Sequence, residues 1–64
     1  MVSVQVLREC VVAGKVITLS YIVVEGFTEG VYKVYVEGDK NFSSCLFLTE
    51  AERHFEHLIE SRKQ

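Results

Sequence analysis

Residues 42–59 read FSSCLFLTEAERHFEHLI, and the spacing of the apolar residues changes within this stretch. Up to Leu48 the apolar residues tend to alternate with others, which is typical of a half-buried strand. From Ala51 onwards they recur at helical spacing, at Phe55 and Leu58. The change of period therefore predicts a sheet that is followed by a single C-terminal helix.

Glycines and short polar segments divide the region before this change into four predicted strands. We expect the strands at about Val2–Val11, Lys15–Glu25, Val31–Glu37 and Phe42–Leu48. Their connections are too short for the crossover of about a dozen residues that parallel strands need. We therefore predict an α+β fold (ββββα). A four-stranded antiparallel meander, about residues 2–48, precedes one amphipathic helix, about residues 49–63, which packs on one sheet face.

The predicted helix begins at a capping box, in which Thr49 is the N-cap and Glu52 reaches back to it. Its buried stripe is expected to consist of Ala51, Phe55, Leu58 and Ile59. A helix of about 15 residues is roughly 22 Å long and about 10 Å wide, whereas four strands span about 19 Å. One helix therefore leaves a sheet face uncovered.

The two faces of the predicted sheet are thus expected to differ. The helix should cover Ile17, Leu19, Tyr21, Tyr32, Val34, Leu46 and Leu48. The opposite face should display Leu7, Ile22, Val24, Val31, Tyr35, Cys45 and Phe47. A small monomer rarely leaves so much apolar surface in water, although sheet twist and loops would hide part of it. We therefore expect self-association through this face, as a homodimer or a higher homo-oligomer.

The first strand offers a second route to self-association. Its residues Val2, Val4 and Val6 alternate with Ser3 and Gln5, and no proline or charge guards this segment as a sheet edge. Edge-to-edge pairing through the three valines is therefore an alternative to packing of the uncovered face. An unidentified protein partner is a further possible occupant of these surfaces.

Composition limits the class of protein. The 64 residues fit a single domain, residues 1–64, and an apolar content of 48% excludes disorder. The formal net charge is −2 and the basic residues are scattered, whereas a nucleic-acid-binding protein usually concentrates them. We recognise no signal peptide and no membrane span, and therefore expect a cytoplasmic protein.

The two cysteines, Cys10 and Cys45, lack the C-x-x-C spacing of redox and zinc motifs. We therefore expect two reduced, partly buried thiols. A reactive Cys10 beside the nearby Arg8 is an alternative to an inert thiol at a strand end.

One face of the helix carries residue types that bind metals. A helical wheel places Glu50, His54, His57 and Ser61 together, so a metal-binding protein is a second alternative function. The simpler interpretation is a solvated face on which Glu50 supports His54 one turn later. Since no nucleophile or phosphate-loop motif is present either, we predict a protein that is not an enzyme and has no catalytic, cofactor or metal residues.

Three aromatic residues are candidate binding positions. Phe27 lies in a connection and either folds back over the core, which we favour, or anchors a partner. Tyr32 and Tyr35 resemble a base-stacking platform, but their spacing along a strand points them to opposite faces. They therefore do not indicate a nucleic-acid site by themselves.

Three segments carry a resemblance to a known family. The segments YIVVEG (21–26), VYKV (31–34) and CLFLTE (45–50), with the helix of Phe55, Leu58 and Ile59, resemble a family of short bacterial proteins of unknown function. That resemblance implies no activity or catalytic motif. The order of four strands and a helix is also similar to the repeat of the purine-rich-element-binding and Whirly proteins, which bind single-stranded nucleic acid.

These observations favour a small, non-catalytic interaction or structural module that self-associates. Binding of single-stranded nucleic acid to the uncovered sheet face is the first alternative, although the scattered basic residues argue against a nucleic-acid partner.

Overall fold

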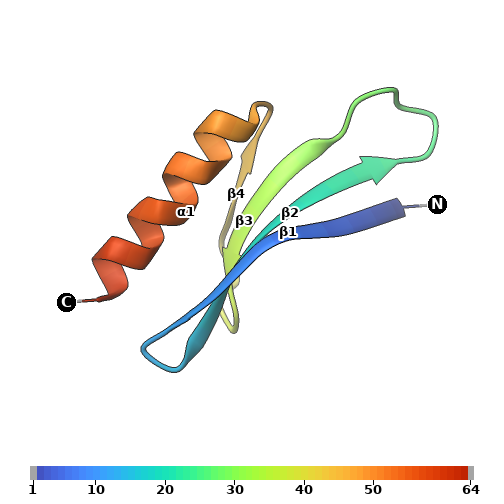
Figure 1. Ribbon diagram of the computed structural model, residues 1–64. Helices are drawn as coiled ribbons and strands as arrows, with labels where there is room; N and C mark the ends of the chain where they lie inside the picture. Colours follow the sequence, from blue (N-terminus) through green and yellow to red (C-terminus); the bar gives the residue numbers. More distant parts are fainter. Residues whose placement is uncertain (1, 64) are drawn as a thin grey trace.

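The computed structural model describes residues 2–63 and has one four-stranded sheet with a helix on one of its faces (Figure 1). The elements are β1 (Val2–Val12), β2 (Lys15–Val24), β3 (Val31–Val36), β4 (Phe42–Cys45) and α1 (Leu48–Arg62). The strands are antiparallel neighbours in the order β1-β2-β3-β4, so the predicted ββββα fold is confirmed. The predicted domain also included residues 1 and 64, which lie outside the described range.

The turn between β1 and β2 explains why the first two strands form a long hairpin. Ala13 and Gly14 both have positive φ angles, 53° and 79°. Two such residues are what a tight hairpin turn needs to match the twist of its strands. Ala13 and Gly14 therefore form the tight turn that closes this hairpin.

The strands of the sheet become shorter from β1 to β4. Pairing runs from Val2↔Val24 to Val12↔Lys15 between β1 and β2, from Ile17↔Val36 to Ile22↔Val31 between β2 and β3, and from Tyr32↔Cys45 to Tyr35↔Phe42 between β3 and β4. The open end of the β1–β2 hairpin, where β1 begins, therefore points away from α1 (Figure 1). The molecule is elongated, with extents of 41 × 22 × 18 Å. Its radius of gyration is 12.0 Å, against about 11 Å for a compact domain of this length.

A β-bulge divides β1 into two parts that present different faces. The register passes from Val6↔Ser20 to Arg8↔Leu19, which leaves Leu7 as the inserted residue. An inserted residue bends the strand and breaks the two-residue alternation. The side chains of Val2, Val4 and Val6 therefore lie on the face opposite α1, whereas those of Arg8 and Cys10 lie on the face that α1 covers. The regular alternation of Val2, Val4 and Val6 does not reveal this change of face.

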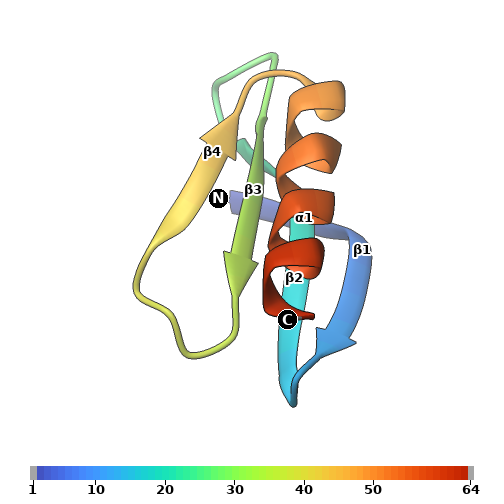
Figure 2. The ribbon, with the colours of Figure 1, turned by 90° about the vertical axis from the view of Figure 1, so that its left-hand side faces the viewer.

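The hydrophobic core lies between α1 and the two central strands. Figure 2 shows α1 in front of β2, with β3 and β4 to one side of it. The buried apolar residues are Val12, Ile17, Leu19, Val34, Val36, Cys45, Ala51 and Phe55, with Leu58 and Ile59 packed against them. The predicted helix stripe is confirmed, and so are Ile17, Leu19 and Val34 beneath it.

The start of the helix differs from the prediction. The N-cap is Phe47, and no side chain in the described chain caps the first turn. The carbonyl of Phe47 accepts from the N–H of Ala51 at 3.2 Å, so Leu48 is the first helical residue. Thr49 is then already inside the helix, where its hydroxyl is no longer placed to cap the first turn. The predicted capping box of Thr49 and Glu52 is therefore wrong.

The last strand is shorter than predicted, and its side chains lie on the opposite sheet faces to those expected. β4 ends at Cys45, which pairs with Tyr32 and is 9% exposed on the helix side. Leu46, Phe47 and Leu48 lie in the connection and the first helical turn, and they are exposed. The expectation that Cys45 and Phe47 belong to the uncovered face is wrong, and so is the expectation that Leu46 and Leu48 are covered.

The physical reason is the register of the β3–β4 hairpin, since a shift of one residue moves every side chain to the other face. The N–H of Asp39 donates to the carbonyl of Val36 at 3.0 Å, and its carboxylate accepts from Arg62 at 3.0 Å. The strand that follows this loop pairs Phe42 with Tyr35 and Cys45 with Tyr32.

Candidate interaction surface

The sheet face opposite α1, called the open face below, is organised in rows of paired residues. One row is Val4, Ile22 and Val31; the next is Val6, Ser20, Lys33 and Ser44; and the third is Glu9, Thr18, Tyr35 and Phe42. Ile22, Val24, Val31 and Tyr35 lie on this face as expected. Apolar residues therefore gather at the free end of the first hairpin, and mixed polar and aromatic residues gather beside them.

The apolar end of the open face forms what we call the valine patch. It consists of Val2, Val4, Val6, Ile22, Val24 and Val31. Its β1 members are more than half exposed, at 57% for Val2, 58% for Val4 and 53% for Val6. The sequence suggested the uncovered face and the first strand as separate surfaces, and the structure joins them into one.

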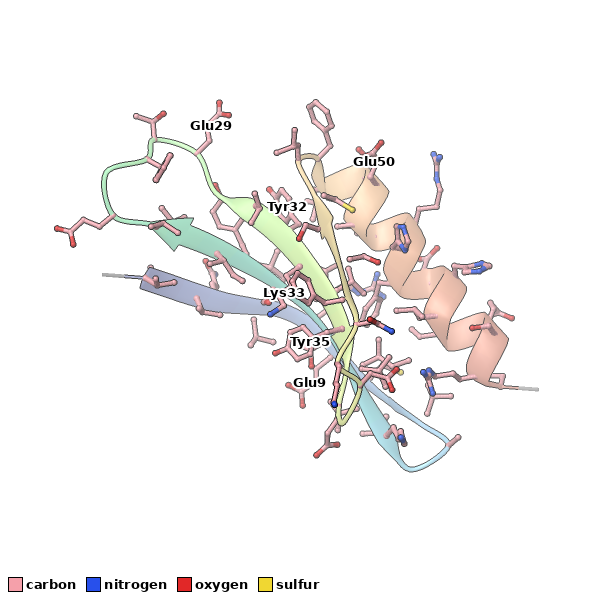
Figure 3. The ribbon with its side chains drawn as sticks, turned by 180° about the vertical axis from the view of Figure 1, so that it is seen from behind. Glu9, Glu29, Tyr32, Lys33, Tyr35 and Glu50 are labelled. Carbon is pink, nitrogen blue, oxygen red and sulfur yellow. The ribbon has the colours of Figure 1, made fainter. Side chains whose placement is uncertain are left out.

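The aromatic part of the open face surrounds Lys33. Its Nζ lies 4.3 Å from the ring centroid of Phe42 and 5.2 Å from that of Tyr35. Figure 3 shows Lys33 and Tyr35 projecting from β3. At these distances the ammonium group is attracted to the faces of both rings. We call Lys33, Tyr35 and Phe42 the Lys33 cluster. The sequence pattern did not reveal it, because alternation along the last predicted strand places Phe42 on the helix side of the sheet.

Ser20 lies beside Lys33 in the same row and is 1% exposed. Its Oγ is buried and has no hydrogen-bond partner among the described residues. A buried hydroxyl without a partner carries a desolvation penalty.

The two edges of the sheet differ in how well they are protected. β4 is an edge of only four residues that leads directly into α1. In the second half of β1, the Arg8 guanidinium lies 4.9 Å from the Phe55 ring centroid and 3.9 Å from the Glu56 carboxylate. The first half, Val2–Val6, is exposed throughout and carries no charge. This segment is therefore the unprotected edge.

The suggested metal ligands line an open cleft between β4 and α1. The cleft has a volume of about 520 Å³ and is lined by Ser44, Cys45, Glu50, Arg53, His54 and His57. Within residues 2–63, however, no group of three or more His, Cys, Asp or Glu residues is placed to hold a metal ion. Ser61, from the same helical-wheel set, donates its hydroxyl to the carbonyl of Leu58 at 3.1 Å. The geometry therefore gives the metal alternative no support.

Both cysteines are free thiols, as expected. Cys45 is buried, and Cys10 is half-buried at the margin of the core. They lie on the two outer strands with β2 and β3 between them. Their arrangement indicates a packing role.

Phe27 is 69% exposed, so the expectation that it folds back over the core is wrong. Its N–H donates to the carbonyl of Val24 at 3.1 Å, and Gly26 before it has a φ of 97°. This tight turn directs the chain away from the core before Phe27 is reached. The exposed ring therefore belongs to the β2–β3 connection and not to the open face.

No helix in the described part of the chain is long and apolar enough to cross a membrane. Comparison of the chain with protein-family models, with curated proteins and with solved structures gave no match.

Proposed function

We propose that this protein is a non-catalytic module that self-associates through the open face and the free edge of β1. The observation that carries the proposal is the accessible surface of the single chain, 4840 Å². A compact monomer of 7.3 kDa exposes about 4,200 Å². The excess of roughly 600 Å² approaches the roughly 800 Å² that each partner buries in a standard interface.

The chemistry of the exposed surface supports the same proposal. The valine patch is contiguous across three strands, whereas small monomers usually scatter their exposed apolar residues. One 15-residue helix leaves this end of the sheet without cover. Contact with a second copy of the chain would remove part of this apolar surface from water. A reducing compartment such as the cytoplasm also fits the proposal, because both cysteines are free.

The assembly state tests this proposal directly. Size-exclusion chromatography with light scattering, over a range of concentrations, should show a dimer or a higher homo-oligomer. Val4→Glu should shift the population to the monomer, because it places a charge in the middle of the valine patch. Leu46→Glu is the matched control, since Leu46 is 71% exposed but lies in the β4–α1 connection. A wild-type chain that stays strictly monomeric at high concentration would overturn the proposal.

A second candidate function is the binding of single-stranded nucleic acid to the open face, and the Lys33 cluster favours it. Exposed aromatic rings stack on bases, and an adjacent ammonium group pairs with phosphate. Lys33 lies over both Tyr35 and Phe42 on this face.

Fluorescence anisotropy with labelled single-stranded oligonucleotides at about 50 mM salt tests this candidate, because the electrostatic term is strong there. Phe42→Ala and Lys33→Ala should each weaken binding, whereas Lys40→Ala, an exposed residue in the β3–β4 connection, should not. Absence of binding by the wild-type chain would remove the candidate.

A further inference from the structure

The unprotected edge of β1 is short and well defined. β2 pairs with one side of the segment Val2–Val6, and every residue of the segment is exposed. The other side presents a row of backbone N–H and C=O groups, which is a template for another strand. The segment contains no proline and no charge, which are the usual means of blocking such pairing.

The free backbone edge that could pair with another strand ends after five residues, because the bulge and contacts with the helix follow it. The inserted Leu7 interrupts the regular backbone, and the charged Arg8 and Glu9 follow it. Arg8 is also held against Phe55 and Glu56 of α1. A strand that pairs with β1 therefore has room only along Val2–Val6.

The sequence of this segment, VSVQV, is self-complementary in an antiparallel arrangement. If two copies pair about Val4, then Val2 lies opposite the second copy's Val6, and Ser3 lies opposite its Gln5. Every valine then has a valine as its cross-strand neighbour, and every polar residue has a polar one. Cross-strand pairs of β-branched residues stabilise a sheet. Each copy supplies the same residues. A second copy of this chain therefore matches the segment through these pairs alone, without an ion pair.

On this basis, and resting on the self-association proposed above, we propose that Val2–Val6 pairs antiparallel with Val2–Val6 of a second copy about a two-fold axis centred on Val4. The product is one continuous eight-stranded sheet. An axis perpendicular to the sheet keeps both helices on one side and both open faces on the other. The two valine patches then meet across the axis and shield each other's side chains at the new strand boundary.

Charged pairs at positions 3 and 5 test this arrangement. Ser3 and Gln5 pair with Val23 and Tyr21, so their side chains lie on the side of the sheet away from the valine patch, and both are exposed. The double variant Ser3→Lys/Gln5→Lys places like charges opposite each other at two positions. The double variant Ser3→Lys/Gln5→Glu places opposite charges there. The two variants alter the same positions and differ only in the sign of one charge.

Sedimentation equilibrium of both variants and of the wild-type chain gives the dissociation constants. We expect the Lys/Lys variant to dissociate at least tenfold more readily than the wild type, and the Lys/Glu variant to match or exceed wild-type affinity. Circular dichroism of each variant checks that its fold is retained.

The possible failures are distinguishable. A monomeric wild type overturns the proposed self-association itself. If the wild type is dimeric and both variants bind equally well, the edge pairing is overturned while association through the open face stands. If both variants dissociate more readily than the wild type, the register centred on Val4 is overturned, because Lys and Glu then do not face each other.

Discussion

Gly30 ends the β2–β3 connection and donates its N–H to the hydroxyl of Tyr21 at 3.0 Å. A Cβ at this position would contact the carbonyl oxygen of Ile22, and it would lie 2.9 Å from Tyr21 Cζ and Val23 Cγ2. The sequence marks Gly30 as part of a connection. It does not show that three residues of β2 occupy the space where a side chain would go, because the glycine meets them only when β2 and β3 pair.

Gly30→Ala should therefore lower the free energy of unfolding by about 1–3 kcal/mol, the usual cost of overpacking. Chemical denaturation at fixed protein concentration measures the change. Thr28→Ala, at an exposed position in the same connection, is the control and should change stability by less than about 0.5 kcal/mol. Equal stabilities of the two variants would show that the backbone at Gly30 can move aside.

Ser20 gives a second prediction at the residue scale. Its buried Oγ lacks a hydrogen-bond partner among residues 2–63, so Ser20→Ala should raise the free energy of unfolding by about 1 kcal/mol. Ser44→Ala, in the same row but exposed, should be close to neutral. Urea unfolding of the two variants makes the comparison, and a loss of stability specific to Ser20→Ala would contradict the expectation.

At the scale of the elements, α1 shows how a local sequence signal is overridden. Thr49 and Glu52 have the spacing of a capping box, yet the helix begins earlier, with Phe47 as its N-cap. The helix buries Ala51 and Phe55 against the sheet, where they are 0% and 1% exposed. Packing of an amphipathic face contributes more to a helix in a protein than one local cap does.

The uncapped start of α1 offers a stabilising substitution. Phe47 has the extended backbone of an N-cap, with φ −120° and ψ 139°, and it is 65% exposed. Phe47→Asp should raise the free energy of unfolding by about 1 kcal/mol, because its carboxylate can accept from the first helical N–H groups. Thr49→Ala, in contrast, should be nearly neutral. Thermal unfolding compares the two, and a large loss in Thr49→Ala would restore Thr49 as the cap.

In the strands too, the sequence pattern predicts some faces correctly and others wrongly. Alternation along β2 and β3 correctly predicts that Ile17, Leu19 and Val34 lie beneath the helix. It fails in β1 after the bulge and in β4, because an inserted residue or a one-residue change of register reverses the faces. Both failures lie in the outer strands, where bulges and loop geometry have the most freedom.

At the scale of the whole molecule, stability and assembly are expected to be coupled. If the valine patch is covered by a second copy, folding and association share free energy, and the midpoint of thermal unfolding depends on concentration. The wild-type midpoint should rise by several degrees over a hundredfold increase in protein concentration. The midpoint of Val4→Glu should not rise. A wild-type midpoint that is independent of concentration would indicate that the monomer is the stable folded unit.

The sequence by itself determined the order of the elements, their antiparallel pairing and the shortage of cover on one sheet face. These properties follow from hydrophobic periodicity, from connection lengths and from the size of one helix relative to four strands. Each of these is a property of a single segment or a simple sum over segments. Only the tertiary structure decided which residues make up the uncovered surface. It joined Val2, Val4 and Val6 to Ile22 and Val24, and it placed Cys45 in the core. The reason is that a face is assigned by register, and register depends on a bulge and a loop whose geometry is fixed only when the strands pack together.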